Sequence, residues 1–413
     1  MHVTMVNNFL YLRGGAERVL FEEAELLRGQ DTEISVFSRR HPQNIPAAHE
    51  ELFPPYVDPF VLPVLGKLQQ APRIIYNRQS YRLFSQFLQQ VKPQLIHAHN
   101  IYGGLTSAIC DAATHQGIPM VMTLHDYKLL CPAYIMIRKG QVCDRCKHGA
   151  YRHCVTGCCH KESLAGSLVY AMESYFTRWG AKYAALRYLI CPSKFMMRQM
   201  LEAGYEASRV VYLPNAVDVR AYTPSFTPGD YLLYVGRLSR EKGIPTLLDA
   251  VRELTMPLAI VGDGPMRAGL EAFVQQHAMT DRVTFYGHQS GEALQRLYQQ
   301  AAFVVIPSEW YENAPMTILE AFAYGKAVVG ARIGGIPEMI EDGETGRLVT
   351  PGQSEELRAT LSTLWADRPA QGAMGRAAHQ VVATRFSPQR HLEDLLSLYQ
   401  RALAPAATVI SDQ

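Results

Sequence analysis

Short apolar runs recur along the chain, separated by longer segments in which apolar residues have helical spacing. Short apolar runs bounded by turn residues are typical of buried strands. We expect strands at Val3–Val6, Ile34–Ser38, Leu95–His99, Met120–Leu124, Arg187–Cys191, Val210–Leu213, Tyr231–Val235, Leu258–Val261, Val283–Tyr286 and Phe303–Ile306. Strands that alternate with helices favour parallel sheets with helices on both faces, so the pattern predicts an α/β protein with doubly wound sheets.

Two segments interrupt this alternation. Residues 41–66 are rich in proline, so we expect an irregular loop there. Residues 131–163 also lack periodicity and contain most of the cysteines. Helical periodicity is clear in residues 74–91, in residues 164–185 and from Ser354 onward, where a last helix is expected from Pro388 to about Ala402, followed by a loose tail.

The composition is that of an ordinary globular protein. Of 413 residues, 48% are hydrophobic and 19% are charged, and this length predicts two or three domains. No apolar run approaches the roughly 18 residues that a transmembrane helix needs. The first twenty residues lack a basic segment followed by a long apolar one. We therefore expect no signal peptide and a cytoplasmic protein.

Charge is unevenly distributed, although the net charge is only +2. Residues 1–215 contain 23 Lys and Arg against 16 Asp and Glu, and the remainder has an acidic excess. Residues 59–110 contain no acidic side chain and five basic ones, namely Lys67, Arg73, Arg78, Arg82 and Lys92. One interpretation is a solvated helical face. The other is a surface that faces anionic lipid or a lipid-diphosphate acceptor.

The stretch from Pro307 to Glu338 combines an anion-binding turn with two carboxylates. It follows a buried strand, carries Glu312 in a loop and enters a helix at Pro315, where the missing N–H costs nothing. Backbone N–H groups at a helix N-terminus bind phosphate, and Glu320 adds a second acceptor about two turns further on. A nucleotide sugar, which is half phosphate and half polyol, suits such a site.

Two other strand-to-helix turns have features of phosphate sites. In the segment Gly236–Gly243, Arg237 and Lys242 can hold a diphosphate, the arginine through a bidentate fork and the lysine as a point charge. Near the N-terminus, Gly14 and Gly15 permit a ligand to approach the backbone closely. The dinucleotide fingerprint Gly-x-Gly-x-x-Gly is absent from that turn.

The chain as a whole resembles glycosyltransferase family 4. The resemblance rests on Glu312, seven residues, Glu320, then Ala-Phe-Ala-x-Gly and Gly-Gly-Ile-Pro-Glu. The Gly236–Gly243 segment matches the phosphate-binding motif of the family. The resemblance covers nearly the whole chain and is more specific in the second half. It implies the GT-B fold, in which two doubly wound, Rossmann-like domains face each other across a cleft.

The resemblance also implies domain boundaries, because Pro214–Asp218 matches the hinge of the family. An N-terminal acceptor domain would span residues 1–215, with a Cys-rich insertion at residues 131–163. A nucleotide-sugar donor domain would span residues 216–387. Residues 388–413 would form a helix that crosses back to the first domain, and a tail.

Roles for individual residues follow from the same resemblance. The expected catalytic residues are His125, which directly follows a strand, Arg237, Lys242 and Glu312. The expected donor-binding residues are Gly14, Gly15, Arg237, Lys242, Gly262, Gly264, His288, Asn313, Ala314, Pro315, Met316 and Glu320. Glu320 would accept hydrogen bonds from ribose, Glu312 and His125 would contact the donor sugar, and His288 would lie by the nucleobase. The alternative for His125 is a hydrogen-bonded structural histidine.

The resemblance implies sugar transfer with retention of configuration, from a UDP- or GDP-linked donor to a hydroxyl of a saccharide or lipid-linked acceptor. Polysaccharide or glycolipid biosynthesis is the expected setting. The N-terminal domain is expected to contact the anionic inner face of a membrane. Nucleic acid is not an expected partner. Because the chain contains no Asp-x-Asp, we expect no catalytic metal. The alternatives are a nucleotide-sugar epimerase of the same fold and a non-catalytic protein that docks a partner.

Six of the eight cysteines lie between Cys131 and Cys159. In a cytosolic chain such clustering favours a metal over disulfides, and two pairs of thiolates can hold a tetrahedral, structural zinc. Free thiols are the alternative. The spacing in a family 4 subgroup with a Cys-rich insertion implies the ligands Cys143, Cys146, Cys154 and Cys159. Cys158 is the rival for the fourth position.

Overall fold

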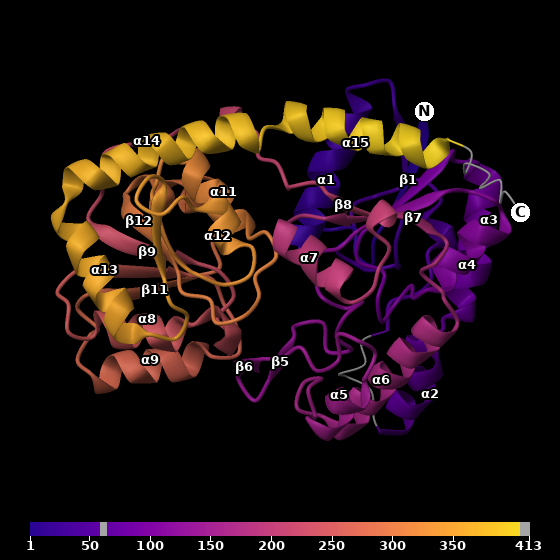
Figure 1. Ribbon diagram of the computed structural model, residues 1–413, viewed down its shortest axis with the longest axis horizontal. Coiled ribbons are helices and arrows are strands. Elements are labelled where there is room, and N and C mark those ends of the chain that lie inside the picture. Colours follow the sequence, from indigo (N-terminus) through magenta and orange to yellow (C-terminus); the bar gives the residue numbers. More distant parts are fainter. Residues whose placement is uncertain (58–63, 405–413) are drawn as a thin grey trace, which may run out of the picture.

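The computed structural model describes residues 1–57 and 64–404, and its architecture consists of two parallel sheets with helices on their faces (Figure 1). Each sheet has six strands, in the order β2-β1-β3-β4-β7-β8 in the N-terminal half and β11-β10-β9-β12-β13-β14 in the C-terminal half. Strand order reverses about β1 and β9, as in doubly wound folds. The expected fold class, two Rossmann-like α/β domains, is therefore confirmed.

All the apolar runs expected to be strands form strands, with ends that differ by at most two residues. The N-terminal sheet contains β1 (His2–Val6), β2 (Glu33–Phe37), β3 (Leu95–Ala98), β4 (Met120–Thr123), β7 (Leu186–Cys191) and β8 (Val210–Tyr212). The C-terminal sheet contains β9 (Tyr231–Val235), β10 (Leu258–Val261), β11 (Val283–Gly287), β12 (Ala301–Ile306), β13 (Val328–Ala331) and β14 (Gly346–Val349). The sequence analysis did not predict β13 and β14, which are short and contain glycine.

The helices that cover the N-terminal sheet or lie beside it are α1 (Gly15–Arg28), α2 (Val64–Ile75), α3 (Arg78–Val91), α4 (Ala108–His115), α5 (Arg152–Thr156), α6 (Leu164–Trp179) and α7 (Lys194–Glu202). Those of the C-terminal half are α8 (Ile244–Val251), α9 (Arg267–Gln276), α10 (Gly291–Gln299), α11 (Met316–Ala323), α12 (Ile336–Met339), α13 (Ser354–Ala366), α14 (Arg368–Arg385) and α15 (Pro388–Leu403). A small antiparallel hairpin, β5 (Ile137–Arg138) and β6 (Gln141–Val142), lies in the Cys-rich segment.

Three helix boundaries differ from the expected ones. The expected helix at residues 74–91 is interrupted, because the Asn77 side chain accepts hydrogen bonds from the N–H groups of Gln79 and Ser80 and so caps a new helix, α3. The preceding helix, α2, already begins inside the expected loop of residues 41–66. The helix expected over residues 164–185 ends at Trp179, where Gly180 forms the C-cap.

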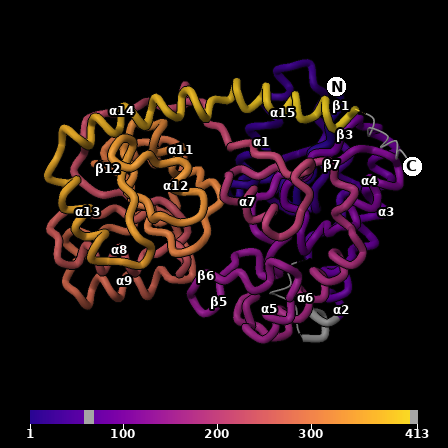
Figure 2. Tube along the Cα trace, viewed as in Figure 1, coloured from indigo at the N-terminus to yellow at the C-terminus, as the bar shows by residue number. Residues whose placement is uncertain are grey.

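The last two helices connect the domains. In Figure 1, α14 and α15 run as one long line across the top of both halves, and Figure 2 shows the same path along the Cα trace. Helix α15 packs against α1 and β3. Its residues Leu395, Leu398 and Tyr399 are buried in the core of the N-terminal domain. The C-terminal helix therefore belongs to the N-terminal domain in its packing.

Some expectations fall outside the described residues. They are the tail after Ala404, the part of the expected loop at residues 58–63, and the side chain of Lys67. Within the described residues, no helix is long and apolar enough to cross a membrane.

Candidate functional site

The candidate residues lie in turns that follow the strands of both sheets. In the second sheet, Arg237 follows β9, Gly262 follows β10, His288 follows β11 and Glu312 follows β12. In the first sheet, His125 follows β4. Parallel strands end at the same edge of their sheet, where ligands bind in doubly wound folds. The structure therefore places each of these residues at a carboxyl edge.

Lys242 and Glu312 form an ion pair at this edge of the second sheet. The Lys242 Nζ donates to Glu312 Oε1 at 2.7 Å, and the Ser308 hydroxyl donates to the same oxygen at 2.6 Å. Burial by itself would raise the pKa of the Glu312 carboxyl, but Lys242 and Ser308 hold that pKa below its ordinary value. Glu312 is thus an ionised, buried carboxylate with a cation beside it.

Two glycines allow the backbone around Lys242 to pack this closely. Gly243 has φ +68°, and a Cβ there would lie 1.9 Å from the carbonyl oxygen of Pro307. Gly262 has φ +128°, and a Cβ there would lie 1.9 Å from the carbonyl oxygen of Gly236. Only glycine adopts such backbone conformations without strain. The turns after β9, β10 and β12 are therefore in direct backbone contact.

The loop that begins at Glu312 also contacts the N-terminal domain. The Asn313 side-chain amide donates to the carbonyl of Leu124 at 2.8 Å, and the Ser193 hydroxyl donates to Asn313 Oδ1 at 2.7 Å. The Asn215 amide donates to the carbonyl of Ala314 at 3.4 Å. Because Leu124 immediately precedes His125, the expected donor loop and the expected catalytic histidine adjoin each other.

The Gly14–Gly15 turn lies against the start of α11. Gly14 is the N-cap residue of α1, and a Cβ on Gly15 would lie 3.8 Å from Met316 Cγ. Pro315 is the N-cap residue of α11. The N-termini of α1 and α11, one from each domain, are therefore neighbours. Their backbone N–H groups can bind the same diphosphate.

Glu320 is held by side chains from both domains. Arg18 on α1 forms an ion pair with its Oε1, and the Tyr298 hydroxyl donates to its Oε2 at 2.9 Å. Arg18 also donates to the hydroxyl of Tyr222. The ion pair joins the first turn of α1 to α11, so it connects the domains directly beside the Gly14–Gly15 turn.

Two of the expected residues, Arg237 and His288, take no part in the hydrogen bonds and ion pairs described above. Arg237 is exposed, and its side chain makes no hydrogen bond or ion pair within residues 1–57 and 64–404. His288 is also exposed and lies near Asp263. Gly264 lies against the turn of Leu238, since a Cβ there would be 2.4 Å from the Leu238 carbonyl oxygen.

His125 is partly exposed and hydrogen-bonded on one side only. Its Nε2 lies 2.9 Å from Nδ1 of His99. Burial lowers the pKa of His125 to about 4, so the imidazole is neutral near pH 7. No hydrogen bond of its Nδ1 is found among the described residues.

Sequence reasoning missed several residues that complete this site. Arg18 and Tyr298 hold Glu320, Ser308 binds Glu312, and His99 binds His125. His99 had a detectable signal, since it ends the expected strand Leu95–His99 just as His125 follows the next one. Arg18 and Tyr298 had none, because each reaches Glu320 from a helix distant in sequence.

The cysteines of residues 131–163 gather around one pair. The thiols of Cys154 and Cys159 share a hydrogen bond, which raises the pKa of Cys154 and lowers the pKa of Cys159 to about 7. Burial raises the pKa of Cys146 to about 12, and its neighbours Cys131, Cys159 and Cys143 add to this. Cys158 makes no such contact among the described residues.

The sulfurs are close but not at the spacing of metal ligands. Within the described chain, three ligand atoms from His, Cys, Asp or Glu lie within 4.8 Å of one another only at Glu23, His97 and His99. The cluster contains the four expected ligands and adds Cys131, which the sequence analysis did not include. The donor set fits zinc chemically, and the ion would have to draw the sulfurs together.

Two family models match the chain. A model described as Glycosyltransferase Family 4 matches residues 13–221, which is half of the chain, and one described as Glycosyl transferases group 1 matches residues 219–381. The boundary between the two matches falls in the segment that links the two sheets.

Curated relatives match over part of their length. The alpha-D-kanosaminyltransferase of Streptomyces kanamyceticus is 32% identical over 174 residues, which cover 41% of this chain and 45% of that protein. The D-inositol 3-phosphate glycosyltransferase of Mycobacterium sp. (strain KMS) is 33% identical over 235 residues, covering 50% and 53%. The chain thus spans about half the length of the curated relatives it matches.

Solved structures match over nearly the whole chain. Sucrose-phosphate synthase from Thermosynechococcus elongatus superposes with a TM-score of 0.72 at 19% identity, covering 97% of this chain and 98% of that one. Anabaena HepE in complex with UDP and glucose superposes with a TM-score of 0.66 at 20% identity, covering 97% and 100%. At these identities the likeness establishes the fold.

Proposed function

Because the chain belongs to glycosyltransferase family 4 and has the GT-B fold, we propose that it transfers a sugar from a nucleoside-diphosphate sugar to an acceptor hydroxyl. The ion pair of Lys242 with the buried Glu312, at the edge where the two domains meet, supports this proposal most directly. The enzyme would act in polysaccharide or glycolipid assembly, on a saccharide or lipid-linked acceptor.

The cations would act on the leaving group. Negative charge develops on the β-phosphate as the sugar leaves, and Lys242 and Arg237 would stabilise it together with the amides of Gly14–Gly15 and Asn313–Met316. Arg237 has no protein partner among the described residues, which leaves its guanidinium fork for a phosphate. No divalent metal is needed in this scheme, because the two cations take its place.

The carboxylates would hold hydroxyl groups. Glu312 binds Lys242 and Ser308 through Oε1 only, so Oε2 can accept from a sugar hydroxyl. Glu320 already accepts from Arg18 and Tyr298, but a carboxylate has about four acceptor positions, and two ribose hydroxyls can share it. His288, Gly262 and Gly264 would lie around the nucleoside. Neither carboxylate is assigned a covalent role.

The decisive experiment is a panel of nucleotide sugars tested for binding and for turnover. UDP- and GDP-linked hexoses should raise the melting temperature by a measurable amount, and one of them should be consumed when an acceptor is present. Product analysis without acceptor separates transfer from epimerisation. A protein that binds none of these donors would not be a transferase and would fit the docking alternative.

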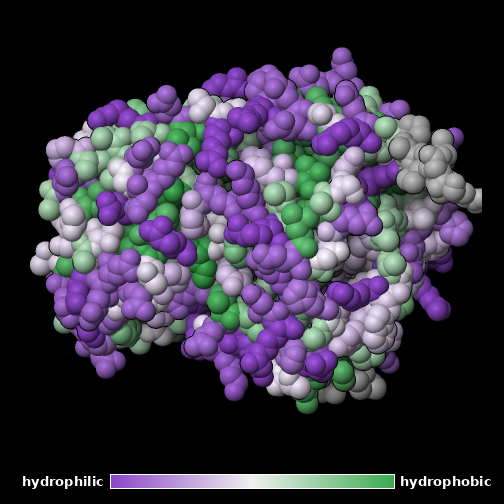
Figure 3. Space-filling view, in the orientation of Figure 1, coloured by the Kyte–Doolittle hydropathy of each residue, from purple (hydrophilic) through white to green (hydrophobic). Residues whose placement is uncertain are grey.

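The N-terminal domain presents a surface suited to a membrane. Helix α6 exposes one apolar side chain per turn along its whole length: Leu164, Leu168, Met172, Phe176 and Trp179. Green, apolar atoms are visible at the lower right edge of Figure 3, where Figure 1 places α6. Arg73, on the neighbouring helix α2, is exposed.

Such a row spans about 24 Å at 1.5 Å per residue and suits an interfacial helix. The contact between the rings of Tyr76 and Phe176, at 5.7 Å, joins the row to the basic segment that contains Arg73, Arg78 and Arg82. We therefore propose that α6 faces an anionic bilayer surface or the lipid part of the acceptor.

A structural zinc would belong to the Cys-rich insertion. Cys143, Cys146, Cys154 and Cys159 would hold it as thiolates, and it would cross-link a segment that has little regular secondary structure. Such a zinc has no open coordination position, so it takes no part in sugar transfer.

A further inference from the structure

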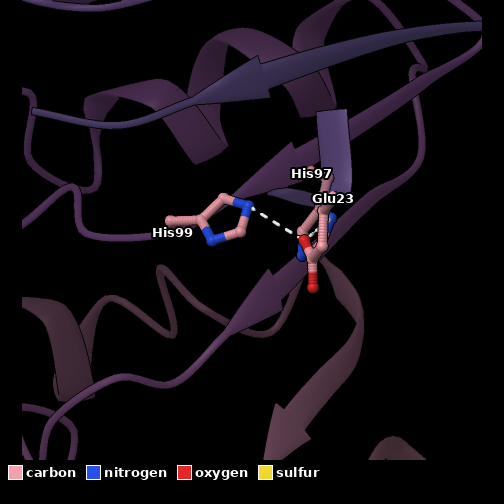
Figure 4. A group of neighbouring side chains, drawn as sticks. All are labelled: Glu23, His97 and His99. Atoms are coloured by element: carbon pink, nitrogen blue, oxygen red, sulfur yellow. Dashed lines mark ion pairs between the residues drawn. The ribbon is translucent and has the colours of Figure 1, made fainter. Parts of the chain in front are cut away.

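A row of buried polar side chains lies behind His125 in the N-terminal domain. It comprises His99 at the end of β3, Glu23 on α1 and His391 on α15, and we call it the buried histidine row. Each of the three is at least nine-tenths buried. Figure 4 shows that the imidazole of His99 points toward the Glu23 carboxylate, with His97 beside it. Because buried polar atoms are costly without partners, the proton positions along the row can be deduced.

The row begins at a charged pair. His391 Nδ1 lies 2.8 Å from the carbonyl oxygen of Pro214, and its Nε2 lies 3.0 Å from Glu23 Oε1. A carbonyl and a carboxylate only accept, so both nitrogens of His391 carry protons. The pKa shifts are consistent with a protonated His391. Glu23 and the Pro214 carbonyl outweigh the effect of burial and raise the pKa of His391, and His391 helps to lower the pKa of Glu23.

The second oxygen of Glu23 faces His99. Neither Glu23 Oε2 nor His99 Nε2 has a hydrogen-bond partner among the described residues, and they lie 3.5 Å apart. If His99 carries its proton on Nε2, this N–H is the donor that Glu23 Oε2 lacks, and Glu23 Oε2 is the acceptor that His99 lacks. Burial keeps the pKa of His99 well below its usual value, so His99 has one proton only. Its Nδ1 is then an acceptor.

The tautomer of His99 determines the tautomer of His125. His99 Nδ1 lies 2.9 Å from His125 Nε2, so His125 must donate from Nε2. His125 is neutral and has no second proton, which leaves its Nδ1 as an acceptor. The stacked arrangement of the two rings, with centroids 5.2 Å apart and planes 16° apart, holds His125 in a single orientation.

We propose that Glu23 and His99 are positioning residues that hold His125 as the Nε2–H tautomer, so that its Nδ1 accepts a hydrogen bond from a hydroxyl of the donor sugar. The inference rests on the proposed function for the identity of the ligand, but the tautomer itself does not depend on it. His391 keeps Glu23 ionised and oriented. The helix that returns from the donor domain thus helps to set the chemistry of the sugar contact.

A metal ion is the competing interpretation of the same atoms. Glu23 Oε2, His97 Nδ1 and His99 Nε2 lie within 4.8 Å of one another. The contacts of His97 argue against a metal ion, because both of its ring nitrogens already have hydrogen-bond partners. Its Nδ1 lies 2.7 Å from the Tyr399 hydroxyl and its Nε2 lies 2.8 Å from Thr123 Oγ1. A metal would have to displace the Tyr399 contact and would remove the acceptor that His99 needs.

The test is a spectroscopic assignment of the tautomer. In protein with ¹⁵N-labelled histidine, two-bond ¹H–¹⁵N correlations should show His125 with a proton on Nε2 and none on Nδ1, with or without nucleotide sugar. The wild-type spectrum decides this without any variant. A proton on Nδ1 of His125 would overturn the proposal, and so would about one equivalent of a transition metal that is lost in Glu23→Gln.

The variant Glu23→Gln adds a functional readout. The Gln carbonyl can keep the bond to His391, while its NH₂ group must donate to His99 Nε2, so His99 turns its proton to Nδ1 and His125 adopts the Nδ1–H tautomer. The kcat for sugar transfer should fall about tenfold or more because the tautomer is wrong, with the KM for the nucleotide sugar little changed.

Glu25→Gln makes the same chemical change on an exposed position of α1 and should leave both spectrum and kcat unchanged. An unaltered His125 tautomer in folded Glu23→Gln would refute the role of Glu23. If no nucleotide sugar is turned over at all, the proposed function fails, and the spectra still decide the tautomer.

Discussion

At the level of single residues, Lys242 has the contacts that the proposed chemistry depends on most. Its ammonium is bound to a buried carboxylate and is still about a quarter exposed, so it can also reach a ligand. A preorganised cation of this kind costs no rearrangement when charge develops on a leaving group. The Arg237 side chain, in contrast, makes no hydrogen bond or ion pair with the residues that the structure describes, so its position is expected to be set by the phosphate itself.

We expect Lys242→Ala to lower kcat/KM for sugar transfer by about 10²- to 10³-fold, because it removes a charge at the β-phosphate and leaves Glu312 buried without its cation. Steady-state kinetics and a melting curve measure the two effects separately. Arg240→Ala removes an exposed cation from the same turn and serves as the matched control. Unchanged turnover in Lys242→Ala would refute its role.

Glu320 is expected to act on binding rather than on the chemical step. Glu320→Ala should weaken the affinity for the nucleotide by about tenfold or more, since two hydrogen bonds from ribose are lost, and calorimetry measures this directly. Tyr298→Phe removes a single bond to the same carboxylate and should have a smaller effect. If Glu320→Ala binds nucleotide normally, Glu320 has only the structural task of holding Arg18.

Among the elements, the Cys-rich insertion has little regular secondary structure, although Met136, Tyr151 and Cys154 are buried in the core of the N-terminal domain. It contains a hairpin of two strands with two residues each and one short helix, and its thiols gather around the Cys154–Cys159 pair. Cys159 shares a hydrogen bond with Cys154, whereas no such bond of Cys158 is found among the described residues. The structure therefore favours Cys159 over Cys158 as a member of the cluster.

Freshly purified protein should contain about one equivalent of zinc, which Cys154→Ser and Cys159→Ser lose and Cys158→Ser retains. Metal analysis by mass spectrometry, together with a melting curve in the presence of chelator, tests this. Less than about half an equivalent in the wild type would favour free thiols. Loss of zinc in Cys158→Ser instead of Cys159→Ser would exchange their roles.

Helix α6 is amphipathic with its apolar row outside, which a helix packed only against its own domain does not require. Trp179 at its end is 79% exposed and stacks on Tyr175. Exposed apolar rows of this length mark interaction sites. The row runs beside α2, so the lipid surface would meet both helices.

The double variant Phe176→Ser/Trp179→Ser should bind vesicles that contain anionic lipid at least about tenfold more weakly, because it removes two large apolar side chains from the interface. Vesicle flotation measures the bound fraction. Ile45→Ser changes an exposed apolar residue elsewhere in the N-terminal domain and should have no effect. Binding that is equal in all three proteins, or independent of anionic lipid, would exclude this surface.

At the scale of the whole molecule, the two domains are joined by buried or half-buried polar contacts rather than by the linker alone. Asn313 binds the N-terminal domain through Leu124 and Ser193, and Arg18 binds Glu320. Helix α15 adds the ion pair of His391 with Glu23. Breaking a buried ion pair by removing one partner is strongly destabilising, so α15 is anchored by charge as well as by apolar packing.

The stability that this pair contributes should depend on pH. His391 has a raised pKa, so its contribution is complete below about pH 6.5 and is lost as the pH rises through the folded value. Glu23 has a lowered pKa, so its contribution is present above about pH 4.3 and is lost in stronger acid. The titratable groups that interact with His391 include Glu23, Asp394, His97 and His99, and the Pro214 carbonyl lies 2.8 Å from its Nδ1.

We therefore expect His391→Gln to cost about 3 kcal/mol in the free energy of unfolding near pH 5.5, and less above pH 8. Urea unfolding of both proteins at the two pH values gives the difference, which includes any change in the titration of His97 and His99 because both interact with His391. A cost that is constant or grows with pH would contradict the charged state of His391.

The sequence by itself determined most strands of the two sheets, all but β13 and β14, and most of the donor turn. Apolar runs specify buried strands locally, and the residues of the Gly236–Gly243 and Glu312–Glu320 segments are close in sequence, so their spacing already carries their geometry. The boundaries of α3 and α6 were missed because caps at Asn77 and Gly180 interrupt the periodic pattern.

Only the tertiary structure decided which side chains from distant segments meet. The Arg18–Glu320 pair joins residues 302 positions apart, and the row from His391 to His125 draws on α15, α1, β3 and β4. No local pattern encodes such contacts, because they depend on how α15 returns to the first domain and how the two carboxyl edges face each other. The protonation state of His125 follows from that packing, and the residue type alone does not contain it.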